Sequence, residues 1–212
     1  MMHNVGAIGV AVLLLGIAQA AAQDVQVGEQ VFARCTICHE IGEGAQNRQG
    51  PLLTGLFGRR AASVPDFPYS EALRQSRADG LIWTPETVAA FIAKPKHFEP
   101  GTGMIFPGLR NELDVADVIA FLQSLQTPAE IELQLGAALV DVYCSSCHAI
   151  GREGTSLHPE APPFRTLHYR YDVGDLEEAL VEGLVSGHPD MPEFEFQPEQ
   201  AKAIVSYLRS LQ

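Results

Sequence analysis

The chain has 212 residues, of which 46% are hydrophobic and 19% are charged, and its formal net charge is −12. This length suits one large or two small domains, and this composition excludes a disordered chain. The acidic balance argues against nucleic acid as a partner, because phosphate binding depends on clustered lysine and arginine.

Residues 1–22 have the pattern of a secretory signal peptide. The apolar run 5–17 is followed by small residues up to Ala22, and we expect cleavage after Ala20 or Ala22. The n-region carries no lysine or arginine, so an uncleaved membrane anchor is the alternative. The run is shorter than the roughly 20 residues of a spanning helix, so the sequence predicts export to the periplasm and no membrane span.

A first domain is predicted over residues 23–127, and its helix at the start leads into Cys35, Cys38 and His39. Cys-x-x-Cys-His is the attachment pattern of c-type haem. Residues three apart share a helix face, so both thiols can reach the vinyl groups of one haem. His39 then lies under the iron as the proximal ligand.

Further helices of this domain are expected at 70–76, at 84–93 and at 112–126. Thr84 is a good N-cap with Pro85 at the first helical position, and this helix should end before Lys94-Pro95. The last helix has its apolar residues at helical spacing. A short join at 125–129 leads into a second domain, so we expect the two domains to touch.

The second domain, predicted over residues 128–212, repeats the motif as Cys144, Cys147 and His148. Helices are expected over 129–143, from an Asp175 cap through Leu184, and over 197–211. A single Cys-x-x-Cys is also compatible with half a zinc site or a redox pair. Two copies that use all four cysteines, with no βαβ pattern around them, favour two covalently bound haem c groups.

Two methionines remain after removal of the signal peptide, Met104 and Met191, one downstream of each motif. A lone methionine is usually a core residue. Both of these lie in loop-like sequence rich in proline and glycine, so we interpret each as the sixth ligand of one iron. In the second domain, His158, His168 and His188 are rivals to Met191.

Residues 28–126 resemble the mitochondrial cytochrome c and bacterial cytochrome c2 family along almost their whole length. The resemblance rests on Gly50 to Arg59, on Pro100 to Phe106, and on Phe32 with Phe121, which match a contact between the terminal helices. It implies that the Pro51 carbonyl orients His39. It also implies that Arg59, Tyr69 and Trp83 hold a haem propionate, and that Thr102 belongs to the methionine-ligand loop. His97 stands where the family usually has lysine; we interpret it as a surface charge, and the alternative is a ligand of the iron.

Residues 128–212 resemble the class I cytochrome c fold more generally. This resemblance implies that Pro162 or Pro163 accepts a hydrogen bond from His148. Nothing in this half matches the propionate residues, and Tyr169, Arg170 and Tyr171 are candidates on their chemistry alone. The expected fold is all-α: two tandem class I cytochrome c domains, each a small bundle of helices around one haem.

The two halves differ in charge. Residues 23–127 carry 12 acidic and 9 basic side chains, whereas residues 128–212 carry 14 and 5, which gives net charges of −3 and −9. Some of the positive charge of the first half is expected near its haem edge, at Arg34, Arg48, Lys94, Lys96 and Arg110. The hypothesis is an acidic redox partner at the first domain and a basic one at the second.

His/Met ligation fills both axial positions of an iron and raises its potential. The sequence therefore predicts an electron carrier rather than an enzyme, which transfers single electrons between redox partners. One alternative is a dihaem enzyme of the peroxidase kind with a labile methionine. Another is the electron-transfer subunit of a dehydrogenase or oxidase complex.

Overall fold

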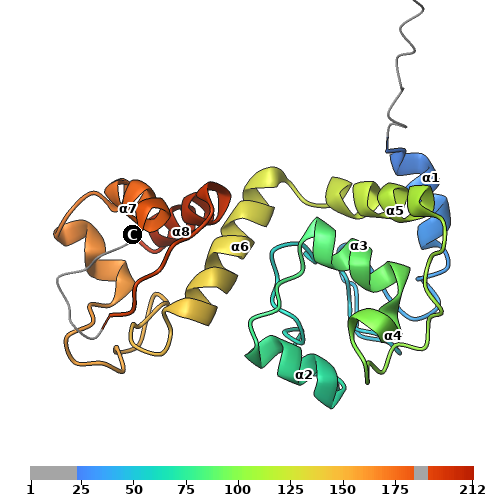
Figure 1. Ribbon diagram of the computed structural model, residues 1–212, viewed down its shortest axis with the longest axis horizontal. Coiled ribbons are helices and arrows are strands. Elements are labelled where there is room, and N and C mark those ends of the chain that lie inside the picture. The colour runs from blue at the N-terminus through green and yellow to red at the C-terminus, as the bar shows by residue number, and fades with distance from the viewer. Residues whose placement is uncertain (1–22, 184–190) are drawn as a thin grey trace, which may run out of the picture.

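The computed structural model describes residues 23–183 and 191–212, so the predicted signal peptide lies outside it. The described part is helical and holds no β-strand, only an isolated bridge between Arg60 and Ile82. Figure 1 shows two groups of helices with α6 between them. The α-helices are α1 Val25–Phe32, α2 Glu71–Ala78, α3 Pro85–Ala93, α4 Pro95–Phe98, α5 Glu112–Ser124, α6 Pro128–Tyr143, α7 Leu176–Glu182 and α8 Pro198–Ser210. Two 3-10 helices, η1 Phe164–Tyr169 and η2 Val173–Asp175, precede α7.

The first domain is built on the crossing of α1 and α5. Asp24 caps α1 by accepting from the backbone N–H groups of Gln26 and Val27. The rings of Phe32 and Phe121 meet with their centroids 5.3 Å apart, as the resemblance predicted. These rings belong to a buried apolar cluster with Leu56, Phe57, Ala61, Trp83, Val88, Leu109, Val118, Ile119 and Leu122.

The second domain repeats this plan with α6 crossing α8. Thr127 and Glu130 form a reciprocal capping box at the start of α6. The ends of these helices and the segments between them supply a second buried cluster, in which Leu139 and Val140 of α6 meet Ile204, Val205 and Leu208 of α8. Because each domain has its own core, the two motifs are supported separately.

Two expectations for the helices need correction. Asp175 makes no side-chain capping bond to α7, whereas Asp172 accepts from the N–H of Gly174 in the preceding turn. α7 ends at Glu182, before Gly183 with φ 96°, and Leu184 lies outside the described residues. The α3 helix ends at Ala93, before Lys94-Pro95 as expected, and the short α4, which was not predicted, begins at Pro95.

In the described ranges, no helix combines the length and the apolar character needed to cross a membrane.

Candidate functional site

The first motif forms a tight turn directly after α1. The backbone N–H groups of Cys38 and His39 both donate to the carbonyl of Cys35, at 3.0 and 2.9 Å. This turn brings the two thiols and the imidazole onto one short stretch of backbone. The Nδ1 of His39 lies 2.7 Å from the carbonyl oxygen of Pro51, so the predicted contact between these residues is present. A carbonyl can only accept, so Nδ1 donates and Nε2 keeps its lone pair for a metal.

Gly50 begins the stretch that carries the resemblance, but sequence reasoning gave it no role of its own, although it fixes the position of the His39 ring. A Cβ at Gly50 would lie 2.3 Å from Cε1 of His39, and its backbone N–H donates to the carbonyl of Cys38 at 2.8 Å. Residue 50 therefore holds the backbone against the flat side of the ring. In the second domain Ala161 precedes the corresponding proline, so the two sites differ at this point.

Burial sets the protonation of the first site. Burial lowers the pKa of His39, partly opposed by its bond to the Pro51 carbonyl, so the ring is neutral at pH 7. Burial also raises the pKa of the Cys35 thiol to about 11, with Arg34 opposing the shift. Burial disfavours a charged thiolate at this position, whereas a thioether carries no charge. Covalent attachment of a haem through this sulfur is therefore compatible with its partial burial.

Met104 lies on a loop that leaves α4 through Gly101, whose φ is 94°. Thr102 shapes this loop, because its hydroxyl accepts from the N–H of Met104 at 3.3 Å and its own N–H donates to Glu99 at 3.0 Å. The Met104 side chain is half-buried, whereas its neighbour Ile105 is 82% exposed. His97 of α4 is exposed.

The three residues predicted to hold a propionate lie close together. Arg59 and Trp83 are joined through the backbone, because the N–H of Trp83 donates to the Arg59 carbonyl at 2.8 Å. The Arg59 guanidinium is partly buried and donates to the carbonyls of Leu52 and Thr54. Burial lowers the pKa of Arg59 while nearby Tyr69 raises it. Trp83 is buried in an aromatic cluster with Phe91 and Phe98.

The second motif follows α6 with the same backbone turn, in which the N–H of His148 donates to the Cys144 carbonyl at 2.9 Å. The His148 Nδ1 lies 2.8 Å from the carbonyl oxygen of Pro162. The Pro163 carbonyl accepts instead from Thr166, so the structure selects Pro162 from the two predicted prolines. The ring of Phe164 packs on His148 with centroids 4.5 Å apart, a contact that sequence reasoning missed.

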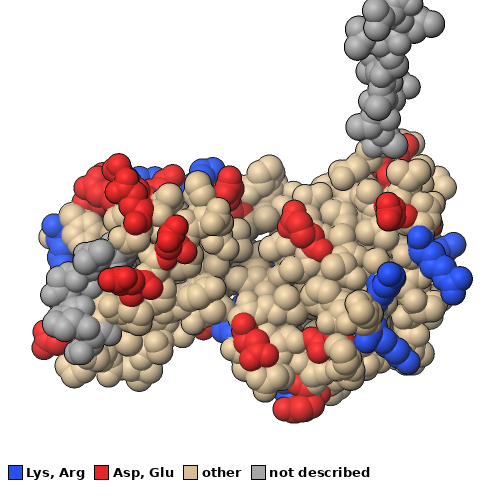
Figure 2. All heavy atoms as spheres, in the orientation of Figure 1, with Lys and Arg blue, Asp and Glu red and all other residues tan. Residues whose placement is uncertain are grey.

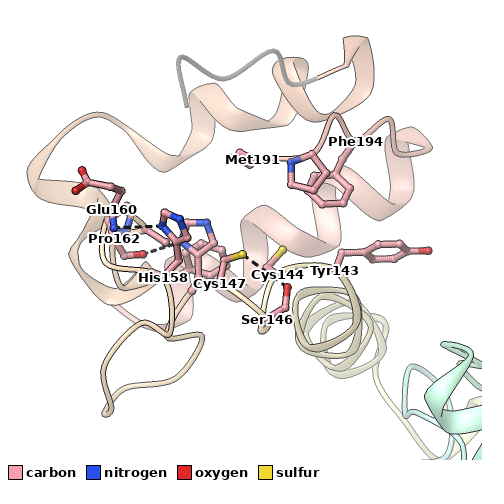
Figure 3. Close-up of a pocket in the computed structure, with 13 residues that line it drawn as sticks. Tyr143, Cys144, Ser146, Cys147, His158, Glu160, Pro162, Met191 and Phe194 are labelled. Atoms are coloured by element: carbon pink, nitrogen blue, oxygen red, sulfur yellow. Dashed lines mark hydrogen bonds between the residues drawn. The ribbon is translucent and has the colours of Figure 1, made fainter. Parts of the chain in front are cut away.

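A mainly apolar cavity surrounds the second motif. It is lined by Tyr143, Cys144, Ser146, Cys147, His148, His158, Glu160, Ala161, Pro162, Phe164, Met191, Pro192 and Phe194. Figure 3 shows Met191 across this cavity from Cys144 and Cys147, while His158 lies on the side of Cys147 and Pro162. Of the two described rival ligands, His158 thus lines the cavity on the side opposite Met191.

The other second-domain candidates lie outside the cavity. His168 is exposed and packs on Tyr169, and Tyr169 is itself 80% exposed. Arg170 and Tyr171 are also exposed. His188 lies outside the described residues.

The donor set fits haem better than zinc. In residues 23–183 and 191–212, no three His, Cys, Asp or Glu side chains form a group that could hold a metal ion. Each site instead offers two thiols and one imidazole with a nitrogen available for a metal, beside apolar side chains. Burial, with a smaller contribution from Cys147, raises the pKa of the Cys144 thiol to about 12, so this sulfur too is better suited to a neutral thioether than to an anionic ligand.

Comparison with known proteins is consistent with this donor set. A sequence profile described as cytochrome c matches residues 25–126 and again residues 133–212. The chain belongs to the cytochrome c family. It carries two cytochrome c domains in tandem, which fits a dihaem protein, and the family suggests electron transfer as the activity.

Each relative matches about half of this chain. Cytochrome c2 of Blastochloris viridis is 47% identical over 115 residues, which is 54% of this chain and 88% of the relative. Cytochrome c2 of Afifella marina is 42% identical over 103 residues, 49% of this chain and 83% of the relative. The solved structure of cytochrome c2 from Rhodospirillum centenum is 34% identical, covers 49% of this chain and 99% of its own, and has a TM-score of 0.47.

Proposed function

We propose that this protein is a periplasmic dihaem c-type cytochrome that passes single electrons between redox partners through two His/Met-ligated haems. The observation that carries the proposal is the repeated geometry of the motif. In each domain a Cys-x-x-Cys-His turn follows a helix, and the histidine Nδ1 is bound to a proline carbonyl at 2.7 or 2.8 Å. A methionine on a later loop accompanies each motif.

The proposed attachment residues are Cys35 and Cys38 in the first domain and Cys144 and Cys147 in the second. His39 and Met104 would bind the iron in the first domain, and His148 and Met191 would bind it in the second. Pro51 and Pro162 fix the two imidazole rings, and Arg59, Tyr69 and Trp83 serve a propionate of the first haem. Haem bound in this way supplies a one-electron couple at a raised potential.

The chain's own residues would keep these centres closed and rigid. The carbonyl of Pro51 or Pro162 prevents its histidine from rotating and makes it a better ligand. The methionine side chain would occupy the place on the iron that a substrate would otherwise need. Apolar walls such as Phe164 and Phe194 limit water near the second site, which reduces the reorganisation that accompanies a change of charge.

Reductive titration of the purified protein tests the proposal. We expect two covalent haems per chain and uptake of two electrons in two one-electron steps, because the two sites have different walls and neighbours. Cys144→Ala with Cys147→Ala should abolish one step and leave the other. Uptake of a single electron by the unmodified chain would contradict the proposal.

The surface charge supports partners of opposite sign for the two domains. Figure 2 shows acidic side chains on both domains, while the larger groups of lysine and arginine visible in this view lie on the first. Arg34, Arg48, Lys94, Lys96 and Arg110 are all exposed. We propose that the first domain docks an acidic redox protein and the second a basic one. Rates of electron exchange with these partners should then fall as ionic strength rises. Rates that do not change with ionic strength would contradict the proposal.

The N-terminal sequence and the relatives together support a periplasmic location. Apolar residues 5–17 and the small residues up to Ala22 form the predicted export signal, and the relatives above are bacterial cytochromes c2. N-terminal sequencing of the mature protein should find its first residue at Ala21 or Gln23. A mature chain that still begins at Met1 would point to the membrane-anchored alternative.

A further inference from the structure

The two domains meet along one side of α6. In the first domain, the loop 55–60 approaches this helix so closely that a Cβ on Gly58 would lie 2.7 Å from the backbone nitrogen of Leu135. Ile131 of α6 packs against the core of the first domain, and Ile82 of the first domain packs against the core of the second. The contact therefore includes backbone and apolar side chains on both sides.

Two glutamines join the backbone of this loop to the start of the second domain. The side-chain amide of Gln126 bonds both backbone groups of Phe57, at 2.9 and 3.2 Å. The amide of Gln134 in α6 donates to the carbonyl of Gly55 at 3.0 Å, and the two glutamines bond each other at 3.3 Å. These bonds fix the N-terminal half of α6.

An ion pair fixes its C-terminal half. The Arg60 guanidinium pairs with the Asp141 carboxylate and also donates to the Arg77 carbonyl at 2.5 Å. The Arg60 side chain is only 14% exposed, and its Nε is a buried atom with no hydrogen-bond partner among the described residues. A guanidinium buried to this extent depends on its carboxylate, since loss of one partner leaves an uncompensated charge.

Asp141 connects this ion pair to the second motif. It lies three residues before Cys144, and its backbone carbonyl accepts from the hydroxyl of Ser145 at 2.5 Å, inside the Cys-x-x-Cys-His turn. Arg60 is the neighbour of Arg59, which is proposed above to serve the first haem. The pair therefore lies between the surroundings of the two sites.

We propose that Arg60 and Asp141 are positioning residues that hold the second motif at one fixed place relative to the first domain. Electron exchange between the two centres then occurs within docked domains and needs no prior domain motion. The part of this inference that concerns electron transfer rests on the proposed function. The docking of the two domains does not, because it depends only on contacts within the protein. Without the pair, the join at 125–127 and the rest of the contact must hold the domains.

The test compares Asp141→Asn with Glu132→Gln in the holoprotein. Glu132 is the matched control, because it lies on the same helix and loses the same charge but pairs with Lys202 and Ser206 inside the second domain. NMR relaxation should show the wild type and E132Q tumbling as one body. In D141N the equilibrium between docked and separate domains should shift by about tenfold or more toward separate domains, with faster independent tumbling. Asp141→Glu should restore most of the docking.

The second measurement is the rate of electron exchange between the haems after rapid photochemical reduction. The rate should not depend on solvent viscosity in the wild type or in E132Q. In D141N it should fall severalfold and decrease further with added sucrose, while the potential of each haem stays unchanged. Tumbling and exchange in D141N equal to those of E132Q would overturn the inference. A wild type that docks but shows no exchange would instead contradict the proposed function.

Discussion

Replacing Met104 or Met191 by alanine should leave one haem iron without its sixth ligand, while the other iron keeps both protein ligands. Each variant should lose one of two sulfur-to-iron charge-transfer bands of the ferric protein. The potential of the altered centre should fall by on the order of 0.1 to 0.3 V, within the roughly 0.8 V that axial ligands span. The physical reason is that a neutral thioether favours the reduced iron. The opened centre should also bind carbon monoxide when reduced.

The matched control for Met191 is His158→Ala. His158 lines the same cavity but lies on the side of Cys147 and Pro162, so its loss should leave both charge-transfer bands in place. For Met104 the control is His97→Ala, because His97 is exposed on α4. If a methionine variant kept both bands and a histidine variant lost one, the ligand assignment would pass to that histidine.

Replacing Gly136 by alanine should be the most destabilising small substitution in the second domain. A Cβ at this position would lie 1.9 Å from the backbone oxygen of Ala203, where α6 crosses α8. The helices must move apart, which strains the core on both sides of the crossing. We expect a loss of about 3 kcal/mol in the free energy of unfolding, although alanine favours helix by roughly 1 kcal/mol over glycine.

The expected loss corresponds to a fall in Tm of more than about 10 °C for a domain of this size. Gly151→Ala is the control, because the nearest atoms to a Cβ there lie 3.9 Å away and its φ is not positive. Gly28→Ala should act in the same way on the first domain, since its Cβ would lie 2.0 Å from the Asp117 oxygen. A G136A protein as stable as G151A would show that the crossing is looser than described.

The helices and the haem motifs could be predicted from the sequence because their signals are local. The cap Thr84, the apolar spacing of α5 and α8, and the two Cys-x-x-Cys-His motifs need no tertiary information. The crossing glycines were missed, although Gly28 and Gly136 stand at nearly the same distance before the first cysteine of each motif. That repeat was the signal that could have found them.

Other features depend on how distant segments meet. The sequence could not choose between Pro162 and Pro163, because the choice depends on which carbonyl the loop turns toward His148. The pair of Arg60 and Asp141 lies 81 residues apart in the chain, and neither residue belongs to a motif. Tyr169 and Tyr171 had suitable chemistry for a propionate, and their exposure in the folded chain could not be read from the sequence.

The wild-type protein itself provides the most direct test of the central claim, which is that both haems are closed by protein ligands. The fully reduced protein is mixed with carbon monoxide, and the oxidised protein with hydrogen peroxide and a reductant. We predict an unchanged optical spectrum with carbon monoxide and no turnover of peroxide. Carbon monoxide binding at either haem, with peroxide turnover, would contradict the account and favour the peroxidase alternative.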